Sequence, residues 1–462
     1  MKLNLTLSKI AEITGAKLVS SAPDTKVVSF VTDSRVITPG DAFLALKGKN
    51  HDARKFIPQV LAQGAAIVMA EEGVELPPHT TASFLLVKDS LKALQVLAKY
   101  HRLNSTLKVA AITGSNGKST TKQMLRAICE TAGETVANMG NFNNQFGVPF
   151  SLLEIQPKHK YGVFELGASQ PGDILETASL AVPDVAVITN VGPSHLEFFH
   201  DLETIYKTKT EIAQCLNFGG TLVYNADDKY LSRLKTEFKG KSLSFGFTPG
   251  ADLQILETEE FAFTYKGEAH MFHLKLERHD KLNAAAAATA AIALGLYMDN
   301  IQKGLAAFTP MPMRLERLTK NGVDFILDCY NANPASMQNA LEILGRSLSH
   351  PRVAVLGDMK ELGATSKEYH RLVAHQLLQN QIDYAFLAGP EMKYAYEKLA
   401  DTTAIKVFYA PAFSGWIKDL SAVLKGGGTC LVKASRSMNF ENILKEIFNP
   451  TCFTTSRCLR TM

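Results

Sequence analysis

The sequence predicts an α/β protein built from three domains. Its 462 residues suffice for roughly three domains of about 150 residues each, and the 46% of hydrophobic residues can fill several cores. From about residue 105, short apolar runs alternate with helix-length segments, which is typical of buried parallel strands with helices between them. The stretch "PMPMR" (310–314) interrupts this alternation with two prolines and predicts a linker.

The first domain is expected to be a small α/β unit over residues 1–104. The apolar runs "VVSFVTDSR" (27–35) and "AAIVMAEE" (65–72) predict strands. Between them, "DARKFIPQVLAQGA" (52–65) has the apolar spacing of a helix and closes with a glycine.

The central domain is expected over residues 105–310. Buried strands are predicted at "LKVAAIT", "KYGVFELG", "DVAVITNVG" and "GTLVYNADD". Helix-length segments such as "KSTTKQMLRAICETAG" (118–133) lie between several of them, which indicates a mostly parallel sheet with helices on both faces. The Ala-rich segment "NAAAAATAAIALGLYM" (283–298) predicts a buried helix.

After the linker, the alternation resumes and predicts a C-terminal domain over residues 311–462. Its strands are expected at "VDFILD", "RVAVLGD", "YAFLAG", "IKVFYA" and "TCLVKAS". This pattern is typical of a Rossmann-like α/β domain.

Composition excludes several classes of function. The net charge of +4 leaves no electrostatic footprint for nucleic acid. No apolar run reaches the roughly 18 residues of a membrane span, and the N-terminus lacks a signal-peptide pattern. The six cysteines form no CxxC pair, so we expect free thiols and a cytoplasmic location. The oligomeric state is not predicted.

The stretch "AITGSNGKST" (111–120) raises the first functional hypothesis. Its end matches the phosphate-loop pattern G-x-x-x-x-G-K-[ST], although Ile112 stands where the first glycine is usual. The loop joins a buried strand to a helix, so backbone N–H groups and the helix N-terminus point at one spot. Lys118 can neutralise phosphates, and the Ser119 hydroxyl can hold Mg²⁺. The alternative is a tight turn with a surface lysine, but the position at the strand–helix junction favours a P-loop-type domain.

Three more side chains are candidates, each with a plain alternative. Glu165 follows a buried strand and could be a metal ligand or a structural hydrogen-bond acceptor. His195 follows another strand end, where a ligand or a structural histidine is possible, and strand ends of such sheets share one edge. Lys209 lies on a helix expected to begin near Asp201, and composition alone predicts a surface lysine there.

The string "TGSNGKSTT" resembles the phosphate loop of the Mur ligase family, T-G-[ST]-x-G-K-[ST], whose members build the peptidoglycan stem peptide. The resemblance covers residues 3 to 448. It implies that the ATP phosphates are bound by Thr113, Gly114, Ser115, Asn116, Gly117, Lys118, Ser119 and Thr120.

The resemblance also implies a Mg²⁺ site. The family's K-x-E motif matches Lys209 and Glu211, and in this family the lysine is carbamylated, which supplies an anionic oxygen ligand. The implied metal ligands are therefore Ser119, Glu165, His195 and carbamylated Lys209. The implied catalytic residues are Lys118, Glu165, His195 and Lys209.

The rest of the ATP site follows from further matches. "RHDKLNAAAAATAA" resembles the family's G-x-H-N-x-x-N-A-x-A-A, in which the second asparagine, here Asn283, contacts adenine; Asp280 replaces the first. Arg314 matches the arginine after the linker and is implied to reach the phosphates. Asp328 is implied as the ribose contact, with Leu327 in place of a preceding aspartate.

Three C-terminal strings resemble the family member that adds D-alanyl-D-alanine. They are "LDCYNANPASMQNAL" (327–341), "VLGDMKELG" (355–363) and "LVKASRSMNFE" (431–441), the last with Ala434 in place of a glycine. They imply a dipeptide site at Tyr330, Asn331, Asn333 and Arg436. Alternatively, the asparagines and Pro334 cap the next helix.

The resemblance assigns the other substrate to the first two domains. "TDSRVITPGDAFLALKGKNHDARKF" resembles the segment that binds the uridine nucleotide and implies contacts from Ser34, Arg35 and Lys47; Ala53 and Arg54 replace the family's usual Gly-His. "GNFNNQFGVP" (140–149) matches the loop that approaches the muramoyl peptide, which implies Asn143, Asn144 and Gln145.

The implied activity is an ATP-dependent ligation of D-alanyl-D-alanine to UDP-N-acetylmuramoyl-tripeptide through an acyl phosphate. The partners are thus two substrates, ATP and Mg²⁺, without nucleic acid or membrane span. One alternative is a sister ligase of the Mur or folylpolyglutamate type that adds a single amino acid. Another is a nucleotide-dependent binding protein without catalysis. The sequence leaves open whether the third stem residue is diaminopimelate or lysine.

Overall fold

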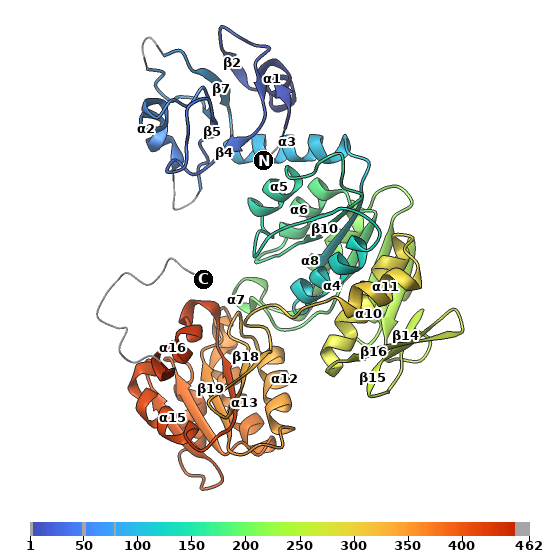
Figure 1. Cartoon of the computed structure of the whole chain (residues 1–462), viewed down its shortest axis with the longest axis vertical. Coiled ribbons are helices and arrows are strands. Elements are labelled where there is room, and N and C mark those ends of the chain that lie inside the picture. The colour runs from blue at the N-terminus through green and yellow to red at the C-terminus, as the bar shows by residue number, and fades with distance from the viewer. Residues whose placement is uncertain (1–2, 49–51, 78–79, 449–462) are drawn as a thin grey trace. The chain divides into compact units, whose positions relative to one another are not determined.

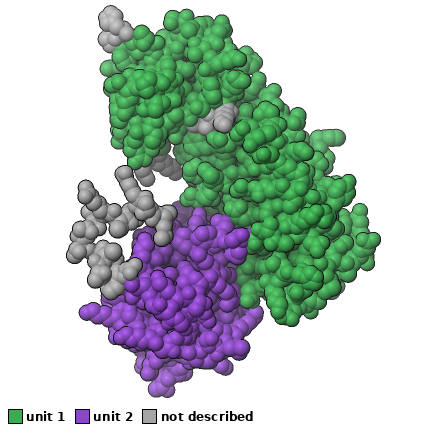
Figure 2. All heavy atoms as spheres, viewed as in Figure 1, with its two compact units in different colours: residues 1–191, 205–308 green, residues 192–204, 309–462 purple. Residues whose placement is uncertain are grey.

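The computed structural model describes residues 3–48, 52–77 and 80–448, and it confirms the predicted α/β fold class. The chain divides into two compact units, residues 1–191 with 205–308 and residues 192–204 with 309–462 (Figure 1 and Figure 2). The last of the three breaks follows Phe308, next to the proline-punctuated stretch, and residues 310–314 form neither helix nor strand.

The N-terminal part of the first unit contains a five-stranded sheet of order β2-β7-β6-β5-β4, parallel except for β2, and a two-stranded sheet β1-β3. A cluster of apolar side chains that includes Phe43, Val68 and Phe84 forms its core. The elements are β1 (Leu5–Thr6), α1 (Leu7–Thr14), β2 (Lys17–Val19), β3 (Lys26–Val27), β4 (Phe30–Val31), β5 (Ala42–Leu44), α2 (Ile57–Ala62), β6 (Ile67–Glu71), β7 (Ser83–Val87) and α3 (Ser90–Leu103).

Two N-terminal predictions are confirmed in kind but not in extent. The predicted strand 27–35 is split, because β3 pairs with β1 whereas β4 pairs with β5 in the other sheet. The predicted helix 52–65 begins as a 3₁₀ turn, Ala53–Phe56, before α2. Pro58 lies in the first turn of α2, where its missing N–H has no helical partner to lose.

A nine-stranded sheet of order β16-β15-β14-β13-β12-β11-β8-β10-β9 forms the rest of the first unit. The pairs from β9 to β14 are parallel, as predicted, and β15 and β16 add an antiparallel edge. Its elements are β8 (Lys108–Thr113), α4 (Lys118–Glu130), β9 (Thr135–Ala137), α5 (Gly147–Leu152), β10 (Tyr161–Glu165), α6 (Asp173–Ala181), β11 (Val185–Ile188), α8 (Leu202–Thr210), β12 (Thr221–Asn225), α9 (Leu234–Glu237), β13 (Lys241–Gly246), β14 (Leu253–Ile255), β15 (Glu260–Tyr265), β16 (Glu268–Lys275), α10 (Arg278–Ala293) and α11 (Met298–Ala306).

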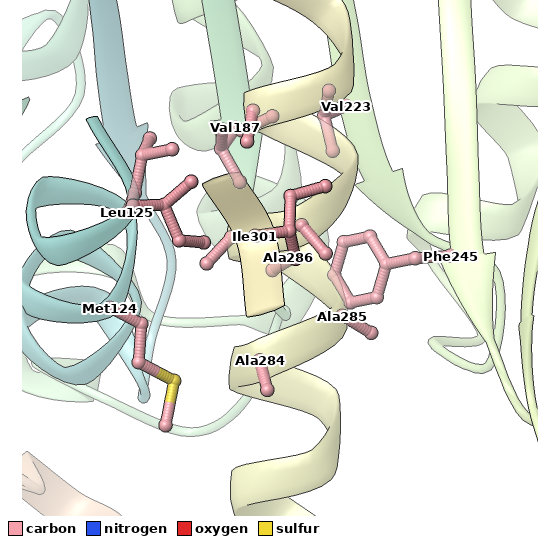
Figure 3. Packing of buried hydrophobic residues seen from close by; sticks show 14 of the residues in the cluster. Met124, Leu125, Val187, Val223, Phe245, Ala284, Ala285, Ala286 and Ile301 are labelled. Atoms are coloured by element: carbon pink, nitrogen blue, oxygen red, sulfur yellow. The ribbon is translucent and has the colours of Figure 1, made fainter. Parts of the chain in front are cut away.

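Helices cover both faces of this sheet. Helices α4, α10 and α11 pack together on one face, and α3, α5 and α6 pack together on the other (Figure 1). Ala284, Ala285 and Ala286 of α10 are fully buried among side chains of α4, α11 and the strands (Figure 3). Alanine favours helix and its small side chain allows close approach, so the predicted buried helix is confirmed. Within the described ranges, no helix has both the length and the apolarity to span a membrane.

The second unit holds a six-stranded sheet of order β17-β18-β22-β19-β20-β21, parallel except for the edge strand β17. All five predicted strands are present. The elements are α7 (Leu196–Phe199), β17 (Glu316–Lys320), β18 (Val323–Leu327), α12 (Pro334–Gly345), β19 (Arg352–Gly357), α13 (Ser366–Gln379), β20 (Tyr384–Ala388), α14 (Lys393–Leu399), β21 (Lys406–Ala410), α15 (Ile417–Leu424), β22 (Gly428–Lys433) and α16 (Ile443–Phe448).

Candidate active site

The predicted phosphate loop connects the end of β8 to the start of α4. Gly114 and Gly117 have φ angles of 149° and 78°, a region that favours glycine. A Cβ atom on Gly114 would lie 1.8 Å from the Thr189 hydroxyl, and one on Gly117 would lie 2.2 Å from Asn283 Oδ1. Both glycines are therefore required by backbone conformation and by close packing, and the loop is compact without the glycine that Ile112 replaces.

Residues after β11 hold this loop in shape. Ser115 N–H donates to the Asn190 carbonyl at 3.0 Å, and Asn116 N–H donates to Asn190 Oδ1 at 2.9 Å. The Thr189 hydroxyl donates to the Asn116 carbonyl at 2.6 Å. Sequence reasoning missed Thr189 and Asn190, although polar residues at the end of an apolar run are a signal for such contacts at the shared sheet edge.

Lys118 begins α4 and its side chain folds back over the loop. Its Nζ donates to the Gly114 carbonyl at 2.7 Å and to the Ser115 carbonyl at 3.2 Å. The ammonium and the N-terminus of α4 thus bring positive charge to the loop, which is suited to an anion. The buried Thr113 hydroxyl, at the end of β8, has no hydrogen-bond partner within the described part of the chain.

Glu165 ends β10 and lies directly beside the phosphate-loop helix. Its Oε2 accepts a hydrogen bond of 2.6 Å from the Ser119 hydroxyl, and its Oε1 accepts one of 2.8 Å from Asn143 Nδ2. Ser119 and Glu165 are buried, with 4% and 3% exposure. The structure therefore brings together three predicted site residues from the phosphate loop, β10 and the 140–149 loop.

The other residues of the 140–149 loop have backbone contacts. Asn144 Oδ1 accepts from the N–H groups of Phe146 and Gly147, which shapes the turn before α5. The Gln145 carbonyl accepts from Gln95 of α3. These contacts fix the loop, and the predicted substrate contacts of the two side chains stay predictions.

Lys209 lies on α8 and is 3% exposed, which excludes the surface-lysine alternative. Burial, followed by the nearby charge of Lys118, lowers the pKa of Lys209 well below its usual value. Two residues further on, Glu211 accepts hydrogen bonds from Gly172 and Leu175 N–H at the start of α6. In the K-x-E motif, the glutamate thus caps a helix and anchors the segment that carries the lysine.

His195 belongs to the segment that joins the second compact unit. It has a φ of 52°, unusual for a residue with a side chain, and its Nδ1 lies 2.5 Å from Glu361 Oε2. The contact with His195 lowers the pKa of Glu361 against the effect of burial. The structure thus joins two motifs that the sequence singled out separately, and the predicted metal contact of His195 stays a prediction.

The residues predicted near adenine lie at the start of α10. Asn283 is 7% exposed; its Oδ1 packs against Gly117 and accepts from Thr121 at 3.4 Å, and its Nδ2 donates to Asp280 at 3.2 Å. Burial disfavours the charge of Asp280, but hydrogen bonds from His279 and Asn283 outweigh it, so the pKa of Asp280 is lowered. Asp280, which replaces an asparagine of the family pattern, thus orients Asn283 at the phosphate loop.

In the second unit, Asp328 forms a partly buried ion pair with Lys433, whose Nζ lies 2.5 Å from Asp328 Oδ2 and also donates to the Asn331 carbonyl at 3.0 Å. The guanidinium of Arg314 lies 4.1 Å from the centre of the Tyr330 ring. Asp328 and Tyr330 follow the end of β18. Lys433 of β22 holds Asp328, and Arg314, on the loop before β17, contacts Tyr330.

The predicted dipeptide residues differ in their surroundings. Asn333 is the N-cap of α12: its side chain accepts from Ser336 N–H at 2.9 Å, with Pro334 next in the helix. Asn333 and Pro334 therefore do cap this helix, and the predicted dipeptide contact of Asn333 stays a prediction. Asn331 is exposed and caps no helix. Arg436 is half-exposed and pairs with Glu441 at 2.5 Å.

The N-terminal candidates lie among exposed and partly buried ion pairs. Arg35 pairs with Asp33 at 2.7 Å beside the buried Ser34. Lys47 lies 3.8 Å from Glu71 at the end of β6, and Arg54 also contacts Glu71, at 3.5 Å. Arg54, which replaces the family's usual histidine, therefore shares an acidic partner with Lys47.

Three models of the Mur ligase family match this chain. The model "Mur ligase family, catalytic domain" matches residues 27–102, "Mur ligase middle domain" residues 112–291 and "Mur ligase, glutamate ligase domain" residues 313–436. Among curated relatives, the UDP-N-acetylmuramoyl-tripeptide--D-alanyl-D-alanine ligase of Bacillus subtilis is 33% identical, covering 96% of this chain and 98% of its own. The enzyme of the same name from Escherichia coli is 32% identical, covering 97% of this chain and 100% of its own.

Solved structures agree with the sequence relatives. MurF from Acinetobacter baumannii superposes with a TM-score of 0.87 at 31% identity, covering 96% of this chain and 98% of that one. MurF ligase from Thermotoga maritima in complex with ADP gives 0.80 at 32% identity, covering 91% and 97%. Both the sequence and the fold therefore place the chain with these enzymes, and it belongs to the Mur ligase family.

Proposed function

We propose that this chain is an ATP-dependent ligase that joins D-alanyl-D-alanine to UDP-N-acetylmuramoyl-tripeptide. The observation that carries the proposal is the match, at 32–33% identity over 96–97% of the chain, to relatives that bear this name. The buried Ser119–Glu165 contact at the phosphate loop supplies the matching chemistry. FolC from Escherichia coli in complex with DHPP and ADP, at 17% identity, shares the fold alone.

The nucleotide end of the reaction follows from the phosphate loop. Its backbone N–H groups and the start of α4 receive the phosphates, and Lys118 exchanges its loop carbonyl contacts for phosphate oxygens. Asn283, which is buried and packs against Gly117, is proposed to contact the adenine of the nucleotide.

The residues present suit Mg²⁺. The Ser119 hydroxyl and the Glu165 carboxylate are both oxygen donors, and they meet at 2.6 Å in a buried position beside the loop. Magnesium prefers oxygen ligands and commonly binds through one or two protein groups together with phosphates. When bound, the ion neutralises charge on the transferred phosphoryl group.

The proposed chemistry proceeds in two steps. The terminal carboxylate of the tripeptide attacks the γ-phosphorus of ATP, which gives an acyl phosphate and ADP. The amine of the dipeptide then attacks the acyl carbon, phosphate leaves, and the amine loses a proton as the amide forms. The chain contributes mainly positioning and charge, because Lys118 binds the phosphate oxygens.

Lys209 is proposed to carry a carbamate. Burial, followed by the charge of Lys118, lowers the pKa of its amine, which favours the neutral form that can react with CO₂. That amine attacks CO₂, an N–C bond forms while one C=O π bond opens onto oxygen, and the nitrogen loses one proton. The resulting anion takes the place of the buried amine beside Lys118 and adds an oxygen donor to the metal site.

The substrates are assigned to the three predicted domains. We assign the UDP-sugar to residues 1–104, ATP to residues 105–310 and the incoming dipeptide to residues 311–462. The exposed Asn331 and the half-exposed Arg436 support the last assignment, because an arginine suits a planar carboxylate. We also propose a cytoplasmic location, since the proposed reaction consumes ATP.

The test is a ligation assay on the purified chain with ATP, Mg²⁺ and UDP-N-acetylmuramoyl-tripeptide. We expect ADP release and a product heavier by the dipeptide only when D-alanyl-D-alanine is present. Tripeptides ending in diaminopimelate and in lysine are compared in parallel to identify the third stem residue.

Two outcomes would contradict the proposal. A product formed with single amino acids but not with the dipeptide would favour the alternative of a sister ligase. Saturable ATP binding without ADP release under any substrate combination would return the non-catalytic alternative.

A further inference from the structure

Asn138 lies directly after β9. Its side-chain amide takes the place of strand backbone and pairs with the backbone of Glu165 on β10. Backbone pairing of β9 with β10 ends at Ala137 opposite Val163, whereas β10 runs on to Glu165. Asn138 Oδ1 accepts from Glu165 N–H at 3.0 Å, and its Nδ2 donates to the Glu165 carbonyl at 2.9 Å. One buried amide therefore satisfies both backbone groups of Glu165 that β9 no longer reaches.

The same amide also holds the loop that orients the carboxylate. Asn138 Nδ2 donates to the Phe142 carbonyl at 2.9 Å. The next residue, Asn143, donates to Glu165 Oε1 at 2.8 Å. A change at Asn138 thus reaches Glu165 along two paths, through its backbone and through Asn143.

Lys122 connects this arrangement to the phosphate-loop helix. It lies on α4 one turn after Ser119, is 1% exposed, and donates from Nζ to the Asn138 carbonyl at 2.8 Å. A buried ammonium is costly unless it is hydrogen-bonded, so its place on this carbonyl is structurally significant. Helix α4 therefore reaches Glu165 twice, directly through Ser119 and indirectly through Lys122 and Asn138.

We infer that Asn138 and Lys122 are positioning residues that hold the Glu165 carboxylate against the phosphate loop for Mg²⁺–nucleotide binding. The inference rests on the proposed function, in which Glu165 is a metal ligand. Hydrogen-bonded neighbours of a ligating carboxylate fix its orientation, and their loss weakens metal affinity. We expect the binding of the other substrates to stay unchanged.

The test uses Asn138→Ala and Asn138→Asp in the full chain. Calorimetry measures ADP affinity without and with Mg²⁺, and steady-state assays measure the Mg²⁺ requirement, kcat and the dipeptide KM. We expect unchanged ADP affinity without Mg²⁺ and a reduced gain on adding Mg²⁺. The half-saturating Mg²⁺ concentration should rise by about tenfold or more. The dipeptide KM should stay unchanged.

Lys122→Met and the double variant with Asn138→Ala test the connection between the two residues. If they act as one unit, the double variant is no worse in Mg²⁺ requirement than Asn138→Ala alone. Thr289→Val is the matched control, because it removes a buried hydroxyl that bonds only within α10 of the same unit.

The outcomes separate this inference from the proposed function. The positioning role would be overturned if Asn138→Asp and Lys122→Met both lower Tm but keep the wild-type Mg²⁺ requirement, as Thr289→Val is expected to do. Ligation by the wild type, and with it the proposed function, would still stand. If Asn138→Ala does not fold, the other two variants still decide. Absence of ligation in the wild type would instead overturn the proposed function.

Discussion

Ser119 donates a 2.6 Å hydrogen bond to Glu165, and both side chains are buried where the phosphate-loop helix begins. The pair joins the end of β10 to the start of α4 at the edge of the sheet where parallel strands end. A buried carboxylate that already accepts one hydroxyl and one amide needs little rearrangement to receive a cation.

Glu165→Gln should keep the shape of this contact but remove its charge. Since the amide is a weaker ligand than the carboxylate for a hard cation, we expect the Mg²⁺ requirement to rise and kcat to fall by about 10–100-fold. The measurement is a Mg²⁺ titration of ADP release. A Mg²⁺ response equal to that of the wild type would remove Glu165 from the proposed metal site.

Lys118→Ala should abolish most turnover while the fold survives. Lys118 is only partly buried and bonds to loop carbonyls, so its loss leaves the core intact, but it removes the charge that faces the phosphates. We expect kcat to fall by about 10²–10³-fold, as when a preorganised donor is deleted. Circular dichroism and Tm provide the check on folding. Near-normal ligation by a folded Lys118→Ala variant would favour the plain strand–helix turn.

Arg436→Ala and Asn331→Ala should weaken dipeptide binding. An arginine that loses its carboxylate partner forfeits a charge-assisted hydrogen bond, so the dipeptide KM of Arg436→Ala should rise by about tenfold or more. ATP parameters should stay unchanged. Glu441→Gln is the control, because Glu441 neutralises Arg436 in the present structure and its loss should not raise the dipeptide KM. If neither Arg436→Ala nor Asn331→Ala alters the dipeptide KM or turnover, the dipeptide binds elsewhere.

Asn333→Ala should act on stability rather than on the dipeptide. Removing the N-cap of α12 leaves the Ser336 N–H without its acceptor and should lower the free energy of unfolding by about 1 kcal/mol. Asn333→Asp, which can still cap the helix, should restore most of that stability. Denaturant unfolding measures the effect. A raised dipeptide KM in both variants would show instead that Asn333 contacts the substrate.

The strands and the phosphate loop could be predicted because their signals are local. A buried run such as residues 107–113, followed by Gly-Lys-Ser-Thr, already contains the strand, the loop and the helix start. The capping role of Asn333 was equally visible, because a cap needs only the residues that follow it.

The remaining features depend on contacts between distant parts of the chain. The hydrogen bonds of Asn138 to Glu165 and the pairing of His195 with Glu361 join residues whose spacing carries no signal. The burial of Lys209 likewise arises from tertiary packing, since its helix resembles a polar surface helix in sequence. For Lys209 the family resemblance, and not the local pattern, indicated a role.

The lowered pKa of Lys209 predicts a pH dependence of stability for the unmodified chain. Between that lowered pKa and the usual lysine value, the unfolded chain binds a proton at Lys209 that the folded chain does not. The free energy of unfolding therefore rises with pH across that window and falls as the pH is lowered through it. Lys209→Met should flatten this part of the curve in urea unfolding at neutral and alkaline pH. Identical slopes for both proteins would contradict the assigned burial of the amine.

Lys209→Ala should be nearly inactive, and short carboxylic acids such as acetate should partly restore its activity. The reason is chemical: a carbamate supplies an anionic oxygen, and a carboxylate that enters the vacated space can supply the same donor. Lys209→Arg is the matched variant. Its guanidinium remains charged at any accessible pH and fills the space, so acetate should not rescue it.

The modification itself is measured separately from the rescue. Mass spectrometry under native conditions, with ¹³CO₂ supplied and ¹³C NMR of the same sample, should detect one carbamate in the wild type and none in Lys209→Ala. The signal should weaken when CO₂ is removed, and activity should weaken with it, because the unmodified amine sits beside Lys118 without an oxygen to offer a cation. Full activity of a CO₂-depleted wild type, together with near-normal Lys209→Ala, would leave Lys209 as a buried neutral amine with a packing role only.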